Sequence, residues 1–76
     1  MSVTIYTTPT CGYCTVAKKY FRENRVAFQE YDVSRDKRRA DEMVHKSGQM
    51  GVPVIDINGK VIVGFNKSEI ERSLKR

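Results

Sequence analysis

The two cysteines of this chain, Cys11 and Cys14, stand three positions apart and enclose Gly12 and Tyr13. A disulfide-stapled domain of this length normally carries four or more cysteines, so one pair is too few for such a scaffold. A bond between neighbours this close removes little entropy from the unfolded chain and stabilises it weakly. The pair is therefore better suited to chemistry, either thiol–disulfide exchange or metal binding.

A strand followed by a helix is predicted to carry the two cysteines. Residues 3–6 alternate apolar and polar side chains, which is typical of a strand, and Pro9 interrupts the pattern. From Cys11 onward apolar residues recur every three or four positions, which predicts a helix with Thr10 as its N-cap. The apolar stripe of this helix consists of Tyr13, Val16, Ala17, Tyr20 and Phe21.

A second strand is expected over residues 27–31, and a second helix is expected from Ser34 to a C-cap glycine, Gly48. A strand-helix-strand unit requires a parallel strand pair with a right-handed crossover. Two cysteines in C-x-x-C spacing at the start of the helix of such a unit are typical of a thioredoxin-like redox site.

The last third of the chain predicts a hairpin and a terminal helix. Asn58 and Gly59 join two apolar runs and favour a type I′ turn, with strands over 54–57 and 60–63. Ser68 begins a capping box that opens the last helix. The predicted fold is therefore α/β, in the order β-α-β-α-β-β-α, with a four-stranded mixed sheet flanked by three helices.

The start of a helix favours a reactive thiol. Free backbone N–H groups and the helix dipole stabilise a thiolate there, and lower a thiol pKa from about 8.5 toward neutrality. Cys11 would lie in that field near solvent, while Cys14 would face inward one turn later. The Cys11 thiolate would attack a substrate disulfide, and Cys14 would then attack Cys11 and release the reduced substrate.

A metal-binding role is the alternative for the same pair. Zinc requires four ligands, and His45 is the only histidine in the chain. His45 is most simply a polar residue of the second helix. A zinc or iron–sulfur site in which Cys11 and Cys14 of two subunits share the metal remains as the second hypothesis.

The length and composition of the chain restrict the classes of protein to which it can belong. The chain has 76 residues, which predicts one domain over residues 1–76. It contains no apolar run of the roughly 18 residues that a membrane span needs, and residues 1–5 lack the features of a secretory signal. We therefore expect a monomer in the cytoplasm, with no membrane partner.

The formal net charge of +5 raises nucleic acid as a partner. Such binding would need exposed aromatic residues among the cations, whereas Tyr20 and Phe21 have core spacing. We therefore expect solvated helix faces that at most steer an acidic partner or glutathione, and no nucleic acid. The basic residues fall in three groups: Lys18, Lys19, Arg22 and Arg25; Arg35, Lys37, Arg38 and Arg39; and Arg72, Lys75 and Arg76.

The motifs together resemble the small glutaredoxins of the thioredoxin fold, especially the NrdH-redoxin and YruB-type glutaredoxin-like proteins. The resemblance covers residues 3–74 and rests on Thr7-x-Pro9-x-Cys11-x-Tyr13-Cys14, Gly51-Val52-Pro53 and Gly64-Phe65. It implies a thiol–disulfide oxidoreductase in electron transport and cell redox homeostasis, with a redox-active disulfide. The implied substrates are protein or small-molecule disulfides. The implied electron donor is glutathione or a thioredoxin reductase, with no tightly bound cofactor.

The resemblance also implies roles for individual residues. Cys11 would be the nucleophile and Cys14 the resolving cysteine. Pro53 would be a cis-proline opposite them, although the sequence itself supports only a proline at a strand entry. The implied substrate-binding residues are Tyr13, Val52, Pro53, Gly64 and Phe65. Of these, Val52 would offer backbone hydrogen bonds to an extended substrate, and Tyr13 would line the rim or pack partly in the core.

Three departures from the family pattern concern glutathione and the redox potential. Gly12 replaces the usual proline of the motif. Thr8 replaces a lysine that helps to hold a glutathione carboxylate, and Phe65 stands in a segment that usually reads Gly-Gly-x-Asp. Lys67 would then be a solvated lysine or a positive charge near the last helix, whose N-terminus at Ser68 could hold a carboxylate.

Overall fold

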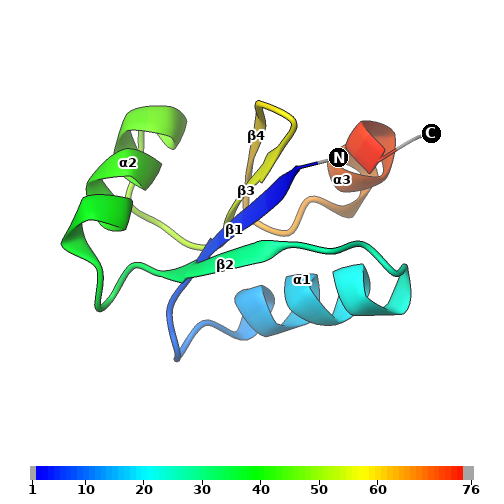
Figure 1. The fold of residues 1–76 in the computed structure, drawn as a ribbon, viewed down its shortest axis with the longest axis horizontal. Coiled ribbons are helices and arrows are strands. Elements are labelled where there is room, and N and C mark those ends of the chain that lie inside the picture. The colour runs from blue at the N-terminus through cyan, green and yellow to red at the C-terminus, as the bar shows by residue number, and fades with distance from the viewer. Residues whose placement is uncertain (1, 75–76) are drawn as a thin grey trace.

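The structure is a computed structural model that describes residues 2–74 as a four-stranded sheet with three helices (Figure 1). The elements are β1 (Val3–Thr7), α1 (Gly12–Glu23), β2 (Gln29–Asp32), α2 (Lys37–Ser47), β3 (Val54–Ile57), β4 (Lys60–Val63) and α3 (Lys67–Leu74). The predicted order of elements is confirmed. Lys75 and Arg76, which belong to the third basic group, lie outside the described residues.

The sheet brings three chain segments to one of its ends. Its strand order is β2-β1-β3-β4, with β1 parallel to β2 and antiparallel to β3, and β3 antiparallel to β4. Tyr6, near the end of β1, pairs with Val54 at the start of β3, and Val54 pairs with Val63 at the end of β4. Asn58 and Gly59 have φ values of 52° and 94°, as the predicted type I′ turn requires. The segments that follow β1, precede β3 and follow β4 therefore meet.

Apolar side chains cover both faces of the sheet because successive residues of a strand point to opposite sides. Ile5 and Ile55 are fully buried in a cluster with Phe21 of α1 and Ile70 of α3. Tyr6, one residue further along β1, is fully buried in a second cluster with Met43 of α2. The helices α1 and α3 thus cover one face and α2 covers the other (Figure 1).

The first two helices begin later than the sequence predicts. Cys11, and not Thr10, is the N-cap of α1, because its backbone is extended and its Sγ accepts the Cys14 backbone N–H at 3.1 Å. In the second helix the N-cap is Asp36, whose side chain accepts the Arg39 N–H at 3.1 Å. Ser34 instead donates its hydroxyl and N–H to the Asp32 side chain in the preceding turn. Gly48 ends α2 with φ 75°, as predicted.

The predicted capping box of the last helix is wrong. Asn66 caps α3, since its Oδ1 accepts the Glu69 backbone N–H at 3.3 Å, and the helix begins at Lys67. The hydroxyl of Ser68 donates to the same Asn66 oxygen at 3.2 Å. An asparagine side chain fills the N-cap position as well as a serine, but the capping-box pattern indicates Ser68 and gives no signal for Asn66.

The second strand also begins later than residue 27, at Gln29. The end of α1 uses the intervening residues, because Arg25 adopts a left-handed φ of 57° and the Val26 N–H bonds to the Phe21 carbonyl at 2.8 Å. Within α1, Val16 is 45 % exposed and does not belong to the buried stripe.

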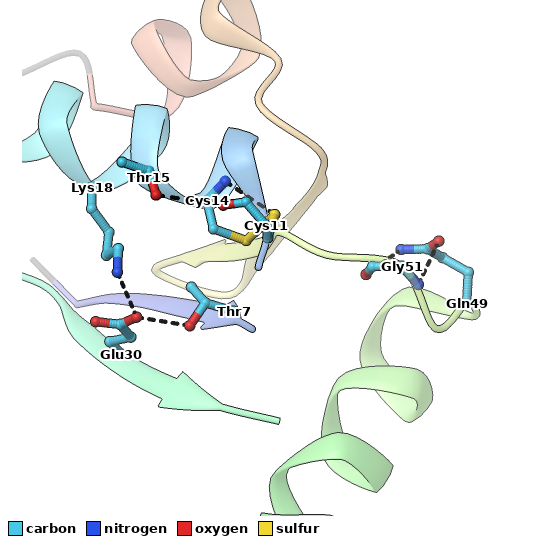
Figure 2. Close-up of a disulfide and its surroundings, with 8 residues drawn as sticks. All are labelled: Thr7, Cys11, Cys14, Thr15, Lys18, Glu30, Gln49 and Gly51. Atoms are coloured by element: carbon cyan, nitrogen blue, oxygen red, sulfur yellow. Dashed lines mark hydrogen bonds and ion pairs between the residues drawn. A yellow bond between two sulfur atoms is a disulfide. The ribbon is translucent and has the colours of Figure 1, made fainter. Parts of the chain in front are cut away.

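A polar bridge ties α1 to the sheet beside the cysteines. Thr7, at the end of β1, is 1 % exposed and donates its hydroxyl to Glu30 of β2 at 2.7 Å. The Nζ of Lys18 on α1 lies 2.8 Å from the same carboxylate oxygen (Figure 2). Hydrogen bonds from Lys18, and less strongly from Thr7, lower the pKa of Glu30 below its ordinary 4.5. Folding therefore favours the ionised form of the Glu30 carboxylate.

This bridge predicts a pH-dependent contribution to stability. A carboxylate whose pKa is lowered on folding stabilises fully above its unfolded pKa of 4.5, and the contribution disappears as pH falls through the lower folded value. Urea unfolding should show that Glu30→Gln lowers the unfolding free energy at about pH 7, and that the difference shrinks below about pH 4.5. Glu23→Gln, at an exposed position of α1, is the control. If Glu30→Gln lowered the unfolding free energy by the same amount at every pH, the stabilising role of the ionised Glu30 would be contradicted.

Candidate active site

The two cysteines lie at the start of α1 and are joined by a disulfide, with their Cα atoms 5.3 Å apart (Figure 2). Their environments differ. Cys14 is 1 % exposed and packs inside the protein, whereas Cys11 is partly exposed. Cys11 is therefore the more accessible of the two cysteines, while the predicted order of attack stays a prediction.

Backbone groups of the first helical turn surround Cys11. Its Sγ accepts the Cys14 N–H at 3.1 Å, and its carbonyl accepts the Thr15 N–H at 3.4 Å (Figure 2). The positive end of the helix dipole lies at the same place. After reduction this N–H group and the dipole would stabilise negative charge on the Cys11 sulfur, which is the requirement for a nucleophilic thiolate.

The segment before β3 lies at the same end of the sheet as the disulfide. The Val52–Pro53 peptide bond is cis, as the resemblance implies, and the Pro53 carbonyl accepts the Gly64 N–H at 2.8 Å. Val52 is partly exposed, and its backbone N–H and carbonyl have no hydrogen-bond partner among residues 2–74. An extended backbone with free hydrogen-bonding groups can pair with another extended chain.

Apolar side chains are exposed between the cysteines in the chain and in the link before β3. Tyr13 is 69 % exposed, which excludes packing in the core, and Met50 is 81 % exposed. Phe65 is partly buried and packs edge-to-face on Tyr20, with ring centroids 5.8 Å apart. Phe65 and Lys67 together line two shallow hollows, one toward α1 and one toward α3. The exposed Lys67 is therefore available to charged groups that enter either hollow.

Two residues of the link between α2 and β3 were not predicted as part of the site. The side chain of Gln49 hydrogen-bonds to the backbone of Gly51, immediately before Val52 (Figure 2). In the sequence Gly51 stands out only as part of the Gly51-Val52-Pro53 motif, and Gln49 carries no signal. Their mutual hydrogen bonds appear only in the structure.

The metal hypothesis receives no further ligand from within the described chain. No group of three or more His, Cys, Asp or Glu residues among residues 2–74 is arranged to hold a metal ion, and His45 is exposed on α2. A metal site built on Cys11 and Cys14 would therefore need ligands from a second subunit.

Within the described chain, no helix is both long enough and apolar enough to cross a membrane.

Comparison with known proteins identifies the family. The glutaredoxin family model matches residues 3–62. An uncharacterized glutaredoxin-like 8.6 kDa protein in the rubredoxin operon of Clostridium pasteurianum is 42 % identical over 74 residues, which cover 97 % of this chain and 99 % of that protein. Glutaredoxin 3 of Escherichia coli is 38 % identical over 63 residues, which cover 83 % and 76 % of the two chains.

The fold leads to the same family. The crystal structure of the glutaredoxin from Methanosarcina mazei superposes with a TM-score of 0.87 at 30 % identity, and the match covers 99 % of this chain and 79 % of the other. The predicted thioredoxin-like fold is therefore confirmed. The chain belongs to the glutaredoxin family and, with Cys11 and Cys14 placed to form its redox-active disulfide, is a thiol–disulfide oxidoreductase.

Proposed function

We propose that this protein reduces disulfides of partner polypeptides through a dithiol cycle in which Cys11 attacks and Cys14 resolves. The observation that carries the proposal is the difference between the two sulfurs. Cys11 is partly exposed and accepts a helix N-terminal N–H, while Cys14 is 1 % exposed. An accessible, anion-stabilised sulfur suits the attack on an external disulfide, and a shielded neighbour suits the second, internal step.

The cycle balances with one external electron donor. The Cys11 thiolate displaces one sulfur of the substrate disulfide, which leaves as a thiolate and takes up a proton, and a mixed disulfide with Cys11 remains. Cys14 then loses its proton and attacks the Cys11 sulfur, which releases the second substrate thiol. The substrate gains two electrons, and the protein is left with the Cys11–Cys14 disulfide that the structure contains.

The residues around the pair support a polypeptide as substrate. The backbone of Val52 has free hydrogen-bonding groups, and cis-Pro53 fixes the direction of the chain beside it. Tyr13 supplies an exposed aromatic surface next to the cysteines in the chain, and Gly64, which precedes Phe65, is hydrogen-bonded to Pro53. We infer that these five residues bind an extended segment on either side of the substrate cysteine.

The dithiol form that attacks would persist in a reducing compartment. We therefore propose that the protein acts in the cytoplasm, as a monomer.

The two cysteines should differ in what their loss does. Cys11→Ser should abolish disulfide reduction, because no accessible thiolate remains. Cys14→Ser should still attack, but should stop at the mixed disulfide, so that intact-mass spectrometry of the reaction with a disulfide-containing peptide shows a covalent adduct on Cys11. Wild-type protein should show this adduct only transiently. Loss of attack in Cys14→Ser with full activity in Cys11→Ser would reverse the assignment.

We infer that a flavin-dependent thioredoxin reductase, and not glutathione, restores the dithiol. Asn66 already accepts the Glu69 N–H at the start of α3, so a glutathione carboxylate would have to displace it there. Phe65 belongs to the segment that precedes this helix, and its aromatic ring packs against Tyr20. Thr8 brings no positive charge to the opposite side of the site.

The donor can be tested with oxidised protein and NADPH in two coupled assays. Thioredoxin reductase should reduce the protein at least about tenfold faster than glutathione with its reductase, which corresponds to about 1.4 kcal/mol in the activation barrier. Thr8→Lys should raise the rate with glutathione because it adds a cation for the carboxylate, whereas Thr8→Val, which adds no charge, should not. Equal rates of the wild-type protein with both donors would overturn the inference about the donor and leave the dithiol cycle intact.

A further inference from the structure

A side-chain clasp orders the link between α2 and β3. The Nε2 of Gln49 donates to the Gly51 carbonyl at 3.0 Å, and the Gly51 N–H donates to the Gln49 Oε1 at 3.0 Å. The amide group therefore pairs with both backbone groups of one residue, as a neighbouring strand would. We refer to these two hydrogen bonds as the Gln49–Gly51 clasp.

The clasp is anchored to the end of α2. The Ser47 Oγ lies 3.0 Å from the Gln49 carbonyl oxygen and accepts the Gln49 N–H at 3.3 Å. Gly48, between them, ends the helix in the left-handed conformation with φ 75°. Both the backbone and the side chain of Gln49 are thus held, so that the helix determines where Gly51 lies.

The segment that the clasp orders leads to the end of the sheet that carries the disulfide, because β3 begins there beside the end of β1. Figure 2 shows Gln49 and Gly51 on this link, set apart from the sulfur atoms of Cys11 and Cys14. Met50, enclosed between the two clasped residues, is 81 % exposed, and Val52, the next residue after Gly51, has the free backbone groups. A loop that is ordered before binding avoids the entropy loss of ordering it in the complex.

We propose that Gln49 is a positioning residue that holds Met50 and the Val52 backbone in place for a polypeptide disulfide. The inference rests on the proposed function and adds specificity to it. An extended polypeptide contacts the clasped segment on either side of its cysteine, whereas a small disulfide reaches only Cys11. The clasp therefore favours polypeptide disulfides over small ones.

Gly51 provides an independent way to open the same clasp. A Cβ at this position would lie 2.8 Å from the Gln49 Oε1, and its other close neighbours are also atoms of the Gln49 amide, at 3.6 Å. Alanine at position 51 would therefore push the flexible end of Gln49 away without a collision with the backbone. Gln49→Ala and Gly51→Ala should have the same effect, and the double variant should have no larger one.

The experiment compares two chromogenic disulfides that differ in length. The small probe is 5,5′-dithiobis(2-nitrobenzoate), and the long probe is a peptide of about ten residues whose central cysteine carries the same thionitrobenzoate group. The length follows from an extended chain rising about 3.3 Å per residue, enough to span the segment on both sides of the cysteine. No electron donor is added, so each fully reduced protein molecule reacts once. The rate of thionitrobenzoate release as a function of probe concentration then gives the single-turnover rate constant, called kcat here, and the half-saturating concentration, called KM here.

Loss of the Gln49–Gly51 clasp should raise KM for the long probe. Gln49→Ala, Gly51→Ala and the isosteric Gln49→Met should each raise KM for the peptide about three- to tenfold, with kcat changed by less than about twofold. The ratio of peptide to small-probe kcat/KM should fall by the same factor. Gln29→Ala is the matched control, because it removes an exposed glutamine paired with Thr4, at the opposite end of β1 from the disulfide. Circular dichroism melting checks that each variant is folded.

The outcomes separate this inference from the proposed function. Equal losses with both probes would show that Gln49 acts on the cysteines and not on the polypeptide, and would overturn the proposal. Unchanged KM in folded variants, or effects of the two substitutions that add, would overturn it as well. If the wild-type protein released thionitrobenzoate from neither probe, the proposed dithiol reduction itself would fail.

Discussion

The hydrogen bond from the Cys14 N–H to the Cys11 sulfur is the interaction on which the rest of the site depends. It makes a cysteine the N-cap of α1, so the Cys11 sulfur occupies the position where the free N–H groups of a helix converge. Every other element can be understood by how it keeps this helix end exposed and fixed. β1 leads directly into the start of α1, and Phe21 of the same helix packs in the core.

A small protein must place its specificity on the loops at the end of its sheet. The strand order brings the segments before β3 and after β4 to the end where β1 delivers the cysteines. Cis-Pro53 and the Gly64 N–H connect these two segments by a hydrogen bond of 2.8 Å. The disulfide and the unpaired backbone of Val52 therefore lie at the same end of the sheet.

The sequence predicts the chemistry of this site better than its boundaries. The C-x-x-C spacing and the Asn58-Gly59 turn are local patterns with few alternatives, and both hold in the structure. The predicted caps at Thr10 and Ser68 are wrong because a neighbouring residue, Cys11 or Asn66, could fill the same role. The choice between adjacent caps depends on backbone angles that tertiary packing determines.

Other features depend on contacts between distant parts of the chain and have no local signal. Thr7 meets Glu30 across 23 positions, because parallel pairing places β1 beside β2. Val16 follows the helical spacing of the stripe but lies outside the core, which only the packing of α1 on the sheet shows. Gln49 and Gly51 are close in sequence, yet the pairing of the Gln49 amide with the Gly51 backbone follows from the path of the chain between α2 and β3.

The most direct test of this account is a redox titration of the wild-type protein in dithiothreitol buffers, with free thiols alkylated and counted by mass spectrometry. We predict one two-electron transition in which Cys11 and Cys14 lose their thiols together and form a disulfide within one chain. Independent oxidation of the two cysteines, or a disulfide between chains as the oxidised product, would contradict it.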